Sequence, residues 1–87
     1  VDADAVGERL ARLADGRQIL VVTHSPQVAA RAHNHWRIGK NETGTTAVTD
    51  VDELGPGERR EEIARMLAGA SITEEARAAA DKLMGAA

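Results

Sequence analysis

His24 has the position in the chain that best suits chemistry. It follows residues 19–22 (ILVV), an unbroken and mostly β-branched apolar run that is typical of a parallel strand buried on both faces. Ser25 can cap a helix and Pro26 suits a first helical position, so we expect a short helix to begin directly after the histidine. His24 would then lie at the carboxyl end of a parallel strand, the edge at which open α/β sheets bind ligands.

Other side chains near His24 suggest three further kinds of site. His33 and His35 would give three histidines for a zinc ion, but no carboxylate is placed to complete the ligand set, so we expect no metal site. Ser25 could act as a nucleophile beside the histidine, but no acid is evident to orient the base, so we expect a helix cap instead. Trp36 could stack on a nucleic-acid base, although a lone tryptophan on an alternating strand is more often half-buried packing.

Composition sets limits on the class of protein. The 87 residues are enough for one small domain, and cysteine is absent, which fits a reducing compartment. The net charge of −3 gives no general attraction to nucleic acid. No apolar run approaches the roughly 20 residues of a membrane span. The chain starts at Val1 without a methionine, and we interpret it as a piece of a longer protein.

The elements that must position His24 follow from apolar spacing and turn residues. Asp15-Gly16 ends a first helix, Pro56-Gly57 opens another, and Gly69 ends it. Ser71 or Thr73 can cap the last helix. Glu61 and Arg65 have the i, i+4 spacing of a helical ion pair. The expected order is helix 3–14, strand 18–23, helix 26–32, a hairpin of strands 35–40 and 45–51 around a turn at 41–44, helix 57–68, and a final helix whose buried stripe is Ile72, Ala76, Ala79, Ala80, Leu83 and Met84.

Two blocks of this sequence resemble the RecN family of bacterial DNA repair proteins, which are SMC-like, ABC-type ATPases. Residues 21–30 (VVTHSPQVAA) resemble the family's switch-histidine region. Residues 58–69 (ERREEIARMLAG) resemble its C-terminal helix, and residues 72–76 (ITEEA) resemble the approach to its last helix. The first block alone is moderately specific, whereas both blocks in this order are quite specific. The resemblance covers essentially the whole chain.

The resemblance implies an α/β fragment of a P-loop ATPase head, with one strand, a hairpin and two C-terminal helices. Residues 1–40 would form the switch-histidine region in helix–strand–helix–strand order, 41–55 the hairpin and loop, and 56–87 the helical pair. His24 would report on the γ-phosphate of ATP. The complete protein would use ATP and Mg²⁺, dimerise through its heads, bind DNA and serve recombinational repair of double-strand breaks in the cytoplasm, at the nucleoid.

Several motifs of such an ATPase are not in this sequence. There is no G-x-x-x-x-G-K-[ST] phosphate loop, no apolar strand ending in Asp-Glu, and no Ser-Gly-Gly signature. We therefore expect the chain alone to be inactive and to bind no cofactor tightly. The family's sheet places strand 19–23 between two strands that this chain lacks, so we expect exposed strand edges and self-association. The alternative is a small stand-alone, non-catalytic α/β interaction module.

Overall fold

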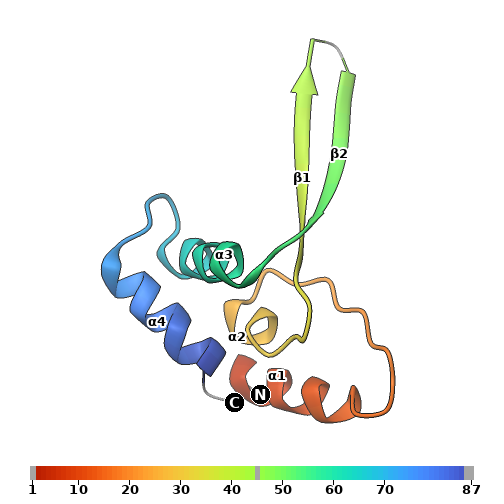
Figure 1. The fold of residues 1–87 in the computed structure, drawn as a ribbon, viewed down its shortest axis with the longest axis vertical. Helices are drawn as coiled ribbons and strands as arrows, with labels where there is room; N and C mark the ends of the chain where they lie inside the picture. The colour runs from red at the N-terminus through yellow and green to blue at the C-terminus, as the bar shows by residue number, and fades with distance from the viewer. Residues whose placement is uncertain (1, 45, 86–87) are drawn as a thin grey trace.

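The computed structural model describes residues 2–44 and 46–85, without the side chains of 41–43. This part of the chain contains a small α/β arrangement in which a two-stranded hairpin projects from a group of helices (Figure 1). No helix in it is both long enough and apolar enough to cross a membrane. The elements in order are α1 (Ala3–Leu13), α2 (Pro26–Ala29), β1 (Trp36–Thr43), β2 (Thr46–Glu53), α3 (Pro56–Ala68) and α4 (Glu74–Gly85).

The ends of the helices lie close to the predicted positions because they depend on local chemistry. The Asp2 carboxylate accepts a hydrogen bond from the Ala5 N–H at 2.8 Å and caps α1. Gly16 and Gly69 lie in the turns that follow α1 and α3, with φ angles of 74° and 83°. Residues with a side chain rarely adopt such positive φ angles, so glycine suits both turns. The Thr73 hydroxyl accepts from the Ala76 N–H at 3.1 Å, so Thr73 rather than Ser71 caps α4.

The prediction of a buried strand at 18–23 is wrong. Residues 18–25 form neither helix nor strand, and Leu20 and Val22 are 85 % and 84 % exposed. A parallel strand needs neighbours whose backbone groups pair with its own, and in the described residues β1 and β2 pair only with each other. The helix–strand–helix–strand order expected over 1–40 is therefore interrupted by an extended, unpaired segment.

The antiparallel hairpin is confirmed, with longer strands than predicted. The pairing runs from Trp36↔Glu53 to Thr43↔Thr46, so β1 continues through most of the expected 41–44 turn. Trp36, Ile38 and Val51 share one face of the hairpin and are 57 %, 61 % and 55 % exposed. The half-buried position expected for Trp36 is not found, because the hairpin extends away from the helices (Figure 1).

The core lies where α3 packs against α4 and α2. Ile63, Ala64 and Ala80 are fully buried, and Ala29 and Ala30 join them from the α2 end. The predicted stripe on α4 is confirmed: Ala76 and Ala80 are buried, Ala79 is partly buried, and Ile72, Leu83 and Met84 pack against the core. Most of the buried residues in this core are alanines, whose small side chains allow the helices to pack closely.

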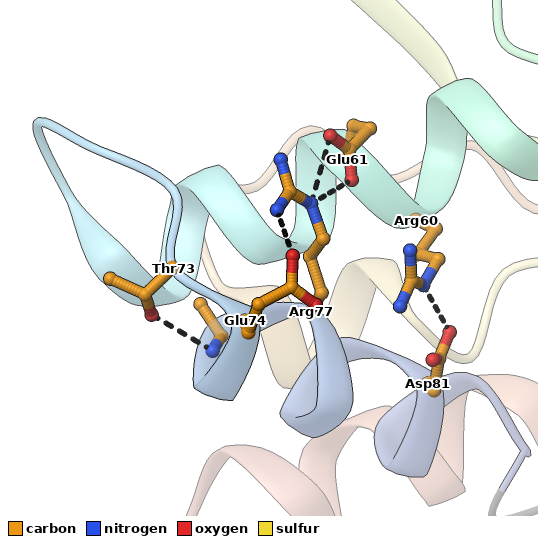
Figure 2. Close-up of polar contacts among 7 residues, drawn as sticks. Arg60, Glu61, Thr73, Glu74, Arg77 and Asp81 are labelled. Atoms are coloured by element: carbon orange, nitrogen blue, oxygen red, sulfur yellow. Dashed lines mark hydrogen bonds and ion pairs between the residues drawn. The ribbon is translucent and has the colours of Figure 1, made fainter.

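Ion pairs join α3 to α4 across the edge of this core (Figure 2). Arg60 pairs with Asp81 at 2.6 Å, and Arg77 binds both Glu61 at 3.0 Å and Glu74 at 2.6 Å. The predicted Glu61–Arg65 pair is wrong, because α4 presents Arg77 to Glu61 and Arg65 bonds to Glu62 instead. These largely exposed pairs orient the two helices and contribute little stability individually.

Candidate functional site

The turn that carries His24 is fixed by the residues on either side of it. The Thr23 hydroxyl oxygen accepts a hydrogen bond from the Ser25 N–H at 3.0 Å. The Ser25 hydroxyl accepts from the Val28 N–H at 3.4 Å and donates to the Gln27 side-chain oxygen at 3.1 Å. Ser25 is therefore the predicted cap of α2, and its proton is directed at an amide rather than at an imidazole that could activate a nucleophile.

His24 itself is exposed, immediately before this cap. It follows the extended apolar segment, in which Ile19 and Val21 are 38 % and 42 % exposed, while Leu20 and Val22 are about twice as exposed. This alternation is that of an extended segment whose successive side chains point to opposite sides. The geometry leaves the imidazole accessible to a ligand from solvent or from another part of a larger protein.

Helix α2 is held on one side by close contact with α1. Gly7 of α1 is buried, and a Cβ atom there would lie 3.0 Å from the Gln27 carbonyl oxygen and 3.1 Å from Cγ of Arg31. A glycine at this position therefore lets the backbones of the two helices approach. Glu8, the next residue of α1, pairs with Arg31 at 3.7 Å.

The other end of α2 is held by Arg59 from the first turn of α3. The two N–H bonds of the Arg59 Nη2 atom are shared among the carbonyl oxygens of Ala29 at 3.0 Å, Ala30 at 3.1 Å and Ala32 at 2.5 Å. The last carbonyls of a helix lack partners within the helix and carry partial negative charge, so a guanidinium suits them. Sequence reasoning missed this contact because Arg59 lies 27–30 residues from its partners and reads as one of several surface charges.

A polar cluster at the base of the hairpin lies beside Arg59. Glu62 is only 7 % exposed, bonded by Arg65 and 3.9 Å from Arg37. The hydrogen bond from Arg65 holds the pKa of Glu62 below its ordinary value. Burial, reinforced by the charge of Arg59, lowers the pKa of His35, whose Nδ1 is buried without a partner in the described structure. The sequence gave no sign that Glu62 is buried, because it lies among other charged residues of the same helix.

The three histidines form no metal site in the described part of the chain. Residues 2–44 and 46–85 contain no group of three or more His, Asp or Glu side chains arranged to hold a metal ion. His33 is exposed in the loop before the hairpin. His35 instead contributes its backbone carbonyl, which accepts the Leu54 N–H at 2.8 Å and closes the base of the hairpin.

The sequence is similar to curated proteins from several bacteria. It is 48 % identical over 82 residues to DNA repair protein RecN of Xylella fastidiosa strain 9a5c, covering 94 % of this chain and 15 % of that protein. It is 55 % identical over 67 residues, 77 % of this chain and 12 % of the relative, to DNA repair protein RecN of Deinococcus radiodurans. The RecN of Halalkalibacterium halodurans is 42 % identical over 82 residues, 94 % of this chain and 14 % of that relative. No protein-family model matches.

Proposed function

We infer that this chain supplies the histidine-bearing edge of an ATPase head. The chain belongs to the RecN family of DNA repair proteins, and it spans about 15 % of the length of the relatives it matches. His24 is proposed as the residue that senses the γ-phosphate of ATP in the complete protein. The similarity extends over 94 % of the chain and includes both blocks that resemble the switch-histidine region and the C-terminal helix.

The observation that carries this proposal is the exposed apolar run that ends at His24. Leu20 and Val22 are more than four-fifths exposed in a segment that has no strand partner in the described structure. Apolar side chains with unpaired backbone on both sides are suited to insertion between strands supplied by another part of the protein. Such insertion would bring His24 to the carboxyl edge of a sheet, where ligands of α/β proteins bind.

The chemistry assigned to His24 is limited to sensing and orientation. Phosphoryl transfer is catalysed chiefly by positioning and charge stabilisation, to which a bound Mg²⁺ contributes most of the positive charge. The described residues hold no cluster of metal ligands, and the sequence has no phosphate loop, so these parts must come from elsewhere in the protein. An exposed imidazole can donate a hydrogen bond to a phosphate oxygen or hold the attacking water.

We extend the proposal to the partners of the complete protein. ATP would be bound between two heads, so that nucleotide occupancy controls head dimerisation, DNA binding and recombinational repair of double-strand breaks at the nucleoid. Without the remaining strands, the run at 19–22 keeps unpaired edges on exposed apolar residues. We therefore also propose that the isolated segment self-associates.

The test is His24→Ala in the full-length protein, with ATP turnover and ATP-dependent head association as readouts. We expect kcat to fall on the order of a hundredfold, as for the loss of one hydrogen-bond donor to a developing charge. The KM for ATP should change much less, since the phosphate loop supplies most ground-state binding.

His33→Ala is the matched control, because His33 is also exposed and lies in the loop between α2 and β1. This variant should retain both turnover and head association. Unchanged turnover together with unchanged association in His24→Ala would overturn the assignment of His24.

A further inference from the structure

We propose that Arg59 is a positioning residue for the turn that carries His24, acting through α2. The proposal rests on the proposed function, because it assigns Arg59 a role in placing the γ-phosphate-sensing histidine. Arg59 touches neither nucleotide nor reacting atoms in this proposal. It fixes the carbonyl end of the helix whose other end is the Ser25 cap next to His24.

Helix α2 is very short. Pro26–Ala29 is four residues, a single helical turn. A single turn is not stable alone, because the cost of ordering its backbone exceeds the gain from its few hydrogen bonds. The position of the His24 turn therefore depends on contacts that hold α2 from outside. These contacts include the Ser25 cap at one end, Gly7 of α1 along one side, the packing of Ala29 and Ala30 in the core, and Arg59 at the other end.

Arg59 reaches several carbonyl groups at the end of α2. Its Nη2 lies within 3.1 Å of the carbonyl oxygens of Ala29, Ala30 and Ala32, so its two N–H bonds are shared among three acceptors. Hydrogen bonds from a charged donor are roughly twice as strong as neutral ones. In this orientation the Nε atom of Arg59 is buried and has no hydrogen-bond partner among the described residues. A surface arginine would be free to hydrate that nitrogen, so this orientation indicates that the carbonyl contacts dominate.

The helix that carries Arg59 is firmly packed. One turn further along α3, Ile63 and Ala64 are fully buried in the core. The helix start is also fixed, because the Glu58 carboxylate accepts a hydrogen bond from the Gly55 N–H at 3.3 Å. Arg59 therefore connects α3, which has fully buried core residues, to α2, which is a single turn that depends on outside contacts. Arg60, the adjacent residue, pairs with Asp81 of α4 and provides a matched control (Figure 2).

The experiment compares Arg59→Gln, Arg59→Lys and Arg60→Gln in the full-length protein, each with and without His24→Ala. We expect Arg59→Gln to lower kcat for ATP on the order of tenfold to a hundredfold, because a displaced group near a reacting centre loses that much. KM for ATP should change little, and the loss should not add to that of His24→Ala. Amide exchange at 28–30 should accelerate by roughly tenfold, as the carbonyl bonds that hold α2 are lost. Arg59→Lys should recover part of the turnover, and Arg60→Gln should keep it.

The outcomes separate this proposal from the one on which it rests. If His24→Ala loses turnover while Arg59→Gln keeps it, Arg59 has no positioning role and the switch assignment stands. If His24→Ala keeps turnover, the switch assignment fails, and the NMR signals of the His24 imidazole decide the positioning role: unchanged signals in Arg59→Gln overturn it. If Arg59→Gln does not fold, Arg59→Lys carries the same comparisons, and full additivity of its loss with that of His24→Ala overturns the proposal.

Discussion

Apolar side chains differ in burial between two regions of the molecule. One region is the four helices, and the other is the exposed part formed by residues 18–24 and the β1–β2 hairpin. In the helices, Ile63, Ala64 and Ala80 are fully buried, and ion pairs between α3 and α4 close the edge of the core. In the exposed part, Leu20 and Ile38 are 85 % and 61 % exposed. Both parts contain large aliphatic side chains, so the presence of such residues does not by itself determine where the core forms.

The chain therefore carries its own helical scaffold but not all of the surroundings of its proposed site. Helices α3 and α4 pack their central apolar residues against each other, although Val6 and Leu13 of α1 are 38 % and 52 % exposed. The residues around His24 and on the hairpin have apolar side chains whose partners would come from the rest of a RecN-like protein. Stability of the segment and assembly of the site are therefore expected to depend on different residues.

The largest test of this comparison uses the same substitution in both parts. Ile63→Ala removes a fully buried side chain and should lower the free energy of unfolding by about 2–5 kcal/mol. Ile38→Ala truncates an exposed side chain and should change it by less than about 0.5 kcal/mol. Urea unfolding of the 87-residue chain, followed by far-UV circular dichroism, measures both.

In the full-length protein, Ile38→Ala should become clearly destabilising if the hairpin face is covered there. Equal effects of the two substitutions in the isolated chain would contradict the comparison. An Ile38 effect that stays near zero in the full-length protein would show that the hairpin face remains uncovered.

The next test concerns how tightly the helices pack around α2. An added methyl at Gly7 meets the Gln27 carbonyl oxygen at 3.0 Å. Overpacking costs about 1–3 kcal/mol and the gain in helix propensity is about 1 kcal/mol, so Gly7→Ala should give a net loss of about 1 kcal/mol. Gly57 of α3 has open space around it, and Gly57→Ala should gain up to about 0.5 kcal/mol. Thermal unfolding of the two variants checks the sign, and stabilisation by Gly7→Ala would show that α1 and α2 are less closely held.

The smallest expected effect is at the junction between the two parts. Because burial and Arg59 lower the pKa of His35, the unfolded chain binds more protons just below pH 6.5 than the folded chain does. Stability should therefore fall as the pH drops below 6.5, and level off below the lowered pKa. His35→Gln should flatten this slope, while His33→Gln in the exposed loop should keep it. Urea midpoints measured between about pH 7.5 and 5, above the range where Glu62 titrates, decide the matter.

The sequence predicted those features whose causes are local. Caps at Ser25 and Thr73, and the glycine turns at 16 and 69, lie where the residue types indicated. The α4 stripe also followed from its spacing. The sequence also predicted a strand at 18–23, which the structure does not contain. An apolar run becomes a strand only when other strands supply hydrogen bonds to it, and the run itself does not show whether they are present.

The site was only partly predictable for a similar reason. The His24–Pro26 turn is encoded by consecutive residues, and its cap is confirmed, whereas the role of His24 stays a prediction. Arg59 and Glu62 looked like members of a charged surface, and their roles appear only when α2 and the hairpin base are placed against α3. The prediction of a Glu61–Arg65 pair was wrong because helical spacing shows only which residues can reach each other. In the structure, Arg77 of α4 binds Glu61 instead.

The location of Trp36 has a practical spectroscopic consequence. It is the single aromatic residue of the chain, and it lies on the exposed apolar face of the hairpin rather than in the core around Ile63. Intrinsic fluorescence therefore reports what covers the hairpin and is largely blind to the packing of the helices. The same chromophore that makes a poor probe of unfolding here is a built-in, label-free sensor for docking of this segment onto the rest of a RecN protein.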